Sequence, residues 1–198
     1  MADYVNDVQE LYVAYFGRPA DPAGLAFWTE KLQDKIVSYD DIAAAFARTG
    51  EYRAAYDHMD TRGVVQEVYD NLFSRPAEES GLNFWINALD TGAMTVDNMV
   101  TMVAMGAQGT DQFAFNAKVA VAEAFTNRID TPQERAAYAG DASNSIAINY
   151  IAGVKDLISA AIARDPGNID MAIARMSSPA TAADEVQLVG VGDAGVLV

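Results

Sequence analysis

The stretch YVAYFGRPADPAGLAFW, residues 12–28, recurs as YDNLFSRPAEESGLNFW at residues 69–85. Each shared residue keeps the same offset, so that Trp28 and Trp85 are 57 positions apart, as are Arg18 and Arg75. Self-similarity at a fixed spacing indicates a duplicated structural unit. The duplication decides the architecture of the chain, although by itself it carries no chemistry.

Each copy predicts a helix, a corner and a second helix. In the first copy, apolar residues recur at helical spacing as far as Phe16. The helix ends there because Arg18 precedes Pro19, and the residue before a proline is displaced from helical backbone angles. Asp21 is the expected N-cap of the second helix, with Pro22 at its first position. The second copy keeps this pattern, with a Glu-Glu pair at the corner in place of Asp-Pro.

The sequence therefore predicts an all-α fold, a multi-helix domain of about nine to eleven helices over residues 1–176. Residues 5–33 and 61–90 are the two expected helix–corner–helix units. A degenerate third unit is expected near residues 119–139, where Arg128 repeats the Phe-x-Arg corner with one residue inserted.

Local signals predict further helix boundaries. Ser38 is the expected N-cap of the helix after the first unit. The segment from Thr131 to Glu134 has the pattern of a capping box with proline at the first helical position. Apolar spacing predicts one longer helix that starts at residue 143 or 144 and reaches residue 161, and Asp165 begins the turn into a last helix.

Residues 177–198 differ in composition from the rest of the chain. They begin as a linker and become rich in valine and glycine from residue 186, so we expect a linker and a short extended tail. Two interpretations of its end stay open, the first strand of a longer chain or the end of a type I secretion signal. The G-x-G-x-x-G pattern at residues 190–195 does not predict a dinucleotide site, because no helix can begin in the few residues that follow.

The repeated arginines and tryptophans are the candidate site residues. Arg18 and Arg75 each end a helix, where free carbonyl groups stabilise a cation; the alternative is an anion or sugar contact made by both. Trp28 and Trp85 each complete an apolar stripe, so we expect both to be mostly buried, with carbohydrate stacking as the alternative.

Two further expectations concern the corner itself. The arginines are expected to bond to carbonyls at the end of the preceding helix or to a carboxylate across the corner, with Asp21 and Glu78 the nearest acids. Gly24 and Gly81 lie in the first turn of the second helix, where we expect the crossing helix to exclude a side chain.

Composition excludes several classes of function. The chain carries 28 Asp and Glu against 13 Lys and Arg, a net charge of −15. Nucleic acid is not an expected partner, since no basic patch opposes the phosphates. The absence of cysteine excludes disulfides, thiolate nucleophiles and zinc–thiolate sites. No apolar run is long enough to span a membrane, and the N-terminus lacks the basic and apolar regions of a signal peptide.

No residue pattern predicts catalysis, so we expect no enzyme and name no catalytic residue. His58 is the only histidine and has no second ligand at metal spacing. The G-x-S-x-G, H-E-x-x-H and EF-hand patterns are absent from the sequence. Close pairs of carboxylates, such as Asp40 and Asp41, are explained as helix caps and dipole partners. The sequence identifies no metal ligands.

The motif Tyr-x-x-x-Phe-x-Arg-Pro-x-(Asp/Glu)-x-x-Gly-Leu-x-Phe-Trp resembles the bacterial family catalogued as domain of unknown function four-two-one-four. The segments FARTGEY, residues 46–52, and FNAKVAVA, residues 115–122, resemble further stretches of that family. The resemblance covers about residues 5–176. The family is found at the start of S-layer proteins and in large secreted surface proteins with calcium-binding repeats.

The resemblance implies a non-catalytic anchoring domain of an extracellular bacterial cell-surface protein, exported by a type I route. Its expected partner is cell-surface polysaccharide or lipopolysaccharide, and calcium is the expected cofactor because a like-charged glycan otherwise repels this chain. Self-association is left open. The alternatives are a protein–protein scaffold, by a looser likeness to the helical domain of phycobilisome linkers, or an accessory domain of a secreted adhesin or enzyme.

Overall fold

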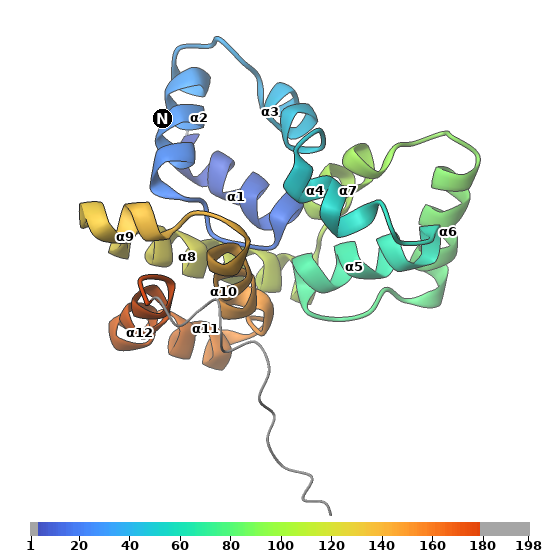
Figure 1. The fold of residues 1–198 in the computed structure, drawn as a ribbon. Coiled ribbons are helices and arrows are strands. Elements are labelled where there is room, and N and C mark those ends of the chain that lie inside the picture. The colour runs from blue at the N-terminus through green and yellow to red at the C-terminus, as the bar shows by residue number, and fades with distance from the viewer. Residues whose placement is uncertain (1–3, 179–198) are drawn as a thin grey trace, which may run out of the picture.

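The structure is a computed structural model that describes residues 4–178, and these residues form twelve α-helices and no strand (Figure 1). The helices are α1 (Tyr4–Phe16), α2 (Pro22–Gln33), α3 (Tyr39–Phe46), α4 (Gly50–Tyr56), α5 (Thr61–Phe73), α6 (Glu79–Asp90), α7 (Val96–Met105), α8 (Gly109–Arg128), α9 (Pro132–Ala137), α10 (Asp141–Ala152), α11 (Leu157–Ala163) and α12 (Pro166–Met176). The predicted all-α fold is confirmed. The predicted number of helices was too low, because the segment predicted as one helix over residues 143–161 forms two.

The unpredicted break lies between α10 and α11. Gly153 ends α10, and α11 starts afresh with its own N-cap, since Asp156 Oδ1 accepts a hydrogen bond from the Ser159 amide at 2.8 Å. The apolar spacing that predicted one helix was misleading, because Leu157 and Ile158 are both exposed. Glycine and a capping residue outweighed the apolar pattern here.

The predicted helix starts are confirmed by side-chain hydrogen bonds. Asp21 Oδ1 accepts from the Gly24 amide at 2.7 Å, with proline at the first position of α2. Ser38 caps α3, and Thr131 caps α9 in the predicted capping box. Asp165 caps α12. These contacts span three residues or fewer, which is why sequence alone was sufficient to predict them.

Helix α1 lies at the centre of the fold (Figure 1). It packs against α2, α3, α5, α7 and α8, and eight of its thirteen residues are buried. A smaller second core joins the end of α8 to the C-terminal helices and consists of Phe125, Ile129, Tyr138, Ala147, Ile169, Ala172, Ile173 and Met176. Helix α8 contacts both halves of the molecule and links the two cores.

The duplication extends further than the predicted helix–corner–helix unit. Helices α3 and α7 begin at Tyr39 and Val96, again 57 positions apart. Helices α4 and α8 both begin with a glycine, Gly50 and Gly109, which are 59 positions apart. Each unit therefore has four helices, α1–α4 and α5–α8. In each unit, the fourth helix starts beside the corner that joins the first two helices.

Equivalent residues begin the two corners in left-handed backbone conformation. Gly17 has φ 62° and Ser74 has φ 53°. Glycine adopts this conformation without strain, whereas serine requires support. Ser74 Oγ donates to the carbonyl oxygens of Ala152 and Val154, so the end of α10 holds the second corner.

Among residues 4–178, no helix is both long and apolar enough to cross a membrane. Of the predicted linker, the described part is Ser177 and Ser178, whose amides bond to carbonyls of the last turn of α12. The predicted extended tail, with both interpretations of its end, lies outside the described residues.

Candidate functional site

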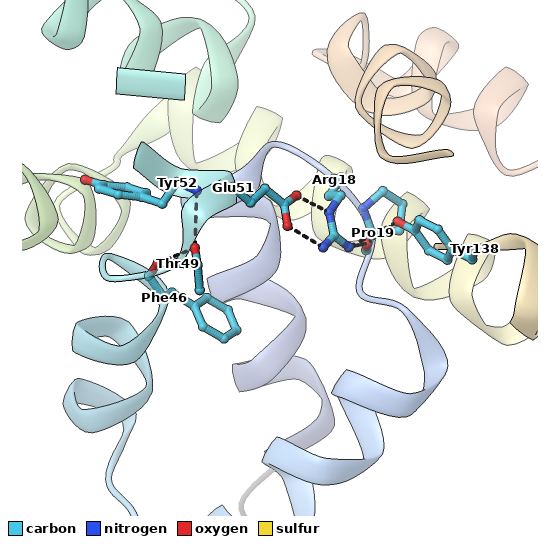
Figure 2. A network of polar contacts seen from close by, with 7 residues as sticks. All are labelled: Arg18, Pro19, Phe46, Thr49, Glu51, Tyr52 and Tyr138. Atoms are coloured by element: carbon cyan, nitrogen blue, oxygen red, sulfur yellow. Dashed lines mark hydrogen bonds and ion pairs between the residues drawn. The ribbon is translucent and has the colours of Figure 1, made fainter. Parts of the chain in front are cut away.

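Arg18 lies in the corner between α1 and α2 and holds a carboxylate of the fourth helix. Its Nε and Nη2 donate to Glu51 Oε1 and Oε2 at 2.6 and 2.9 Å, and its Nη1 donates to the Pro19 carbonyl oxygen at 3.1 Å (Figure 2). Only 6% of Arg18 is exposed. Two parallel bonds between a guanidinium group and a carboxylate are the strong form of this interaction. We call such a pair an arginine clamp.

Tyr138, which follows α9, closes the first clamp. Its hydroxyl donates to the Pro19 carbonyl oxygen at 2.5 Å and accepts from Arg18 Nη1 at 3.4 Å (Figure 2). Burial lowers the pKa of Arg18, but the hydrogen bonds and charges of Glu51 and Tyr138 outweigh this effect and raise that pKa overall. The first clamp is therefore a charged pair beneath a tyrosine lid.

Arg75 makes the same clamp in a more open place. Its Nε and Nη2 donate to Asp111 Oδ1 and Oδ2 at 2.7 and 2.6 Å, and its Nη1 donates to the Pro76 carbonyl oxygen at 2.8 Å. The Arg75 side chain is 30% exposed. The hydrogen bond to Asp111 is the largest of the effects that raise the pKa of Arg75. Glu78 adds an ion pair at 3.3 Å.

The predicted kind of contact is confirmed, but the predicted acids were only partly right. Asp21 was the expected partner of Arg18, whereas it caps α2 and the partner is Glu51, 33 residues along the chain. Glu78 does pair with Arg75, but Asp111 provides the two-bond contact. Each guanidinium group thus donates hydrogen bonds from its Nε and both Nη atoms to partners within the chain.

The third Arg-containing corner forms a clamp as well. Arg128, the last residue of α8, donates from Nε and Nη2 to Asp170 Oδ1 at 2.9 and 2.6 Å. Both side chains are about half exposed. This pair joins α8 to α12 and repeats, on the surface, the contact that the first clamp makes in the interior.

The glycine of the motif is required by the tyrosine of the preceding helix. A Cβ atom on Gly24 would lie 2.1 Å from Tyr12 Oη, closer than any real contact. At the equivalent Gly81, the distance to Tyr69 Oη would be 3.2 Å. The predicted exclusion of a side chain is confirmed at Gly24, and the second unit is looser.

The Phe-Trp pair of each unit is divided between the core and the surface. Trp28 and Trp85 are partly buried, which is less than the sequence predicted, and Trp85 Nε1 donates to Tyr69 Oη at 3.1 Å. The preceding Phe27 and Phe84 are 49% and 60% exposed. Each phenyl ring meets its tryptophan edge to face, with centroids 4.9 Å apart in both units. We call Phe27/Trp28 and Phe84/Trp85 the exposed aromatic pairs.

The two phenylalanines were missed as candidates, although their repetition was visible. In the first pair, Lys31 Nζ lies 4.7 Å from the centroid of the Phe27 ring. The equivalent position in the second unit is Ala88, so that unit has no lysine there. The two pairs therefore share geometry and differ in charge.

The acidic residues of the described part of the chain form no metal-binding group. Within residues 4–178, no three or more His, Asp or Glu side chains come together in a way that could hold a metal ion. His58 is exposed. Calcium takes six to eight oxygen ligands, so isolated carboxylates provide too few by themselves.

Lys118 is a buried cation that sequence reasoning did not single out. It lies on α8 with 1% exposure, and its Nζ donates to the carbonyl oxygens of Asp70 and Asn71 at 3.1 and 2.7 Å. Burial lowers the pKa of Lys118 to about 8. The lysine satisfies carbonyl groups in the last turn of α5, where a helix dipole favours a cation.

The fold and its corners define an all-α domain in which two four-helix units, each closed by an arginine clamp, are followed by the four helices α9–α12. The family model described as Domain of unknown function (DUF4214) matches residues 2–56 and 43–107, which together cover more than half of the chain. The chain belongs to this family. No curated protein and no solved structure matches it.

Proposed function

We propose that this chain is a non-catalytic anchoring domain that attaches a bacterial cell-surface protein of the S-layer type to glycan of the outer envelope. The supporting observation is the repetition of the exposed aromatic pairs at equivalent places in the two units. Exposed phenyl rings lose water when a ligand covers them, and the C–H face of a sugar is a suitable cover. Two weak contacts on one rigid domain reinforce one another.

The two exposed aromatic pairs differ in charge, and this supports different roles for them in binding. The net charge of −15 opposes an anionic glycan, whereas Lys31 beside Phe27 gives that pair a local cation. In this proposal calcium acts between single surface carboxylates and glycan phosphates, with ligands from both sides. The extracellular location and type I export implied by the family resemblance belong to the same proposal.

The test is a pull-down of purified protein on whole bacterial cells, with calcium or with a chelator. Phe27→Ala/Phe84→Ala should lose at least about tenfold in binding, since each ring contributes a large apolar contact. Phe113→Ala is the matched control, because Phe113 is 41% exposed but lies on α8, outside the pairs. It should bind as the wild type does.

The same assay can also contradict the anchoring proposal. Binding should require calcium and should disappear on cells stripped of surface polysaccharide. A wild-type protein that ignores cells under every condition would remove the anchoring proposal. Equal binding by the double phenylalanine variant and the wild type would remove the aromatic pairs from it.

A protein–protein scaffold is the second candidate, favoured by α11. Leu157, Ile158 and Ile162 are 60–74% exposed, and α11 has no charged residue. Helix α11 therefore offers an apolar surface at which two copies of the chain can meet, with the exposed carboxylate of Asp156 at its start. Sedimentation should then give a dimer that Ile158→Glu dissociates, and a monomer at all concentrations would exclude this self-association.

A further inference from the structure

Helix α11 carries its large aliphatic side chains on the outside of the molecule. Leu157, Ile158 and Ile162 are 60–74% exposed. The smaller residues Ala160 and Ala163 are the ones that are partly buried, and they pack against the larger of the two cores. A surface helix of a globular protein normally has the opposite arrangement, with its large apolar residues turned inward. A contiguous apolar patch that stays exposed marks an interaction surface.

The exposed apolar patch continues onto α12. Met171 is 58% exposed and lines a pocket of about 290 Å³ together with Ile162. We call Leu157, Ile158, Ile162 and Met171 the α11–α12 surface. Figure 1 shows both helices at the lower edge of the molecule, apart from α2 and α6, which carry the exposed aromatic pairs. The α11–α12 surface is therefore separate from the proposed glycan contacts.

Three cations lie around the α11–α12 surface. Lys155 precedes α11, Arg164 follows it, and Arg175 lines the same pocket as Ile162 and Met171. All three are exposed, and none of them forms an ion pair within residues 4–178. Their charged groups are available to a partner.

The three carboxylates of the same segment are already engaged within the chain. Asp156 and Asp165 each accept hydrogen bonds from amides at the start of the helix that they cap. Asp170 binds Arg128 in the third clamp. A helix N-terminus and a guanidinium group both offset the charge of a carboxylate. In a chain of net charge −15, the groups that this surface offers to a partner are therefore aliphatic and cationic.

We infer that the α11–α12 surface lies on a lipid surface whose headgroups carry phosphate. The aliphatic side chains enter the boundary between headgroups and acyl chains, while the cations meet the phosphates. Helix α11 has seven residues and is about 10 Å long, so it lies in the plane of the interface. The inference goes beyond the glycan contact and does not depend on it.

The composition of α11 favours lipid over the second copy of the chain considered above. Protein–protein interfaces draw most of their binding energy from tryptophan, tyrosine and arginine, and leucine is under-represented among such residues. The outer face of α11 has neither an aromatic ring nor a hydrogen-bonding side chain. Acyl chains require neither, because their contact is purely apolar.

The experiment is co-flotation of the purified chain with vesicles of phosphatidylethanolamine and phosphatidylglycerol. It is done at physiological ionic strength, where charges more than about 8 Å from the headgroups are largely screened. The wild type should float with the vesicles. Ile158→Ser/Ile162→Ser should bind at least about tenfold more weakly, since two aliphatic side chains no longer leave water. Arg164→Glu/Arg175→Glu should bind about fivefold more weakly or worse, because the attraction to the headgroups is lost.

Two controls separate folding from lipid binding. Met105→Ser changes a side chain that is 77% exposed on α7, outside the α11–α12 surface, and should float as the wild type does. All of these variants should melt like the wild type, because the side chains that they change are exposed. The inference is overturned if the wild type stays in the aqueous fraction, or if Ile158→Ser/Ile162→Ser floats equally well.

The other occupant and the glycan proposal give different results. If the surface joins two copies instead, the wild type sediments as a dimer, Ile158→Ser/Ile162→Ser sediments as a monomer, and neither floats, which overturns the lipid inference. Phe27→Ala/Phe84→Ala should float as the wild type does, whether or not it has lost its binding to cells. Loss of flotation in that variant would overturn the assignment of the lipid contact to the α11–α12 surface.

Discussion

The Arg18 and Arg75 clamps use the same bonds, but they differ in what covers them. The Arg18 side chain is 7% exposed beneath Tyr138, whereas the Arg75 side chain is 30% exposed. The lid comes from the C-terminal part of the chain, so the first clamp depends on residues 120 positions away. An ion pair near solvent contributes little to stability, while breaking a buried pair is costly. We therefore expect the clamp covered by Tyr138 to contribute more to stability than the open one.

The largest expected effect separates these two clamps. Arg18→Ala leaves Glu51 without its partner beside a buried tyrosine and should lower the free energy of unfolding by about 3 kcal/mol or more. Arg75→Ala should lower it by about 1 kcal/mol, since the Arg75 side chain is 30% exposed and its second partner, Glu78, lies close to water. Urea unfolding measures both values. Arg128→Ala, in the half-exposed third pair, serves as the surface control. Equal losses at Arg18 and Arg75 would contradict the proposed effect of the lid.

The second prediction concerns the end of α5, which Lys118 closes. The folded protein lowers the pKa of Lys118 from its ordinary value near 10.5 to about 8 through burial. Between these values the unfolded chain binds the extra proton, so the stability that depends on Lys118 rises as the pH rises through this window. Below pH 8 both states are charged and the burial penalty is fully present.

The measurement compares the wild type with Lys118→Met at pH 7 and pH 10. The difference in unfolding free energy between the two proteins should move by about 2 to 3 kcal/mol in favour of the wild type. The Met variant serves as the control because the remaining ionisable groups are common to both proteins. A difference that does not depend on pH would show that Lys118 keeps its ordinary pKa in the fold.

The smallest of the three effects distinguishes the motif glycines. Gly24→Ala should cost about 1 to 3 kcal/mol, because Tyr12 is buried against Phe16 and Phe46 and has little room to move. Gly81→Ala should be close to neutral, since a slight shift of Tyr69 is balanced by the higher helix propensity of alanine.

Thermal melting of both alanine variants gives this comparison directly. Tyr12→Phe in the Gly24→Ala background removes the clashing hydroxyl and should recover most of the lost stability. If Gly24→Ala melts like the wild type, the close packing of α1 on α2 is not as described.

What sequence reasoning predicted and what it missed follow from the range of each contact. Asp21, Ser38 and Thr131 bond to atoms within three residues, so their roles could be predicted from local patterns. The partner of Arg18 lies 33 residues away, and nothing local identifies Glu51. Glu51 and Asp111 follow the helix-starting Gly50 and Gly109 by one and two residues and are 60 positions apart, so the repeat spacing of 57 does not pair them.

The surface residues were harder to predict than the clamps. A Phe-Trp pair on a helix must direct one ring away from the other, but periodicity alone did not show that Phe27 and Phe84 face water.

The central claim is that the repeated arginines maintain the fold and the repeated phenylalanines bind the ligand. One experiment tests it, by measuring urea unfolding and whole-cell binding in parallel for Arg75→Ala and Phe27→Ala/Phe84→Ala. The account predicts that Arg75→Ala is less stable and binds cells normally, while the double phenylalanine variant keeps wild-type stability within about 1 kcal/mol and loses at least about tenfold in binding. The reverse pattern, binding lost with Arg75 and kept without the two rings, would contradict it.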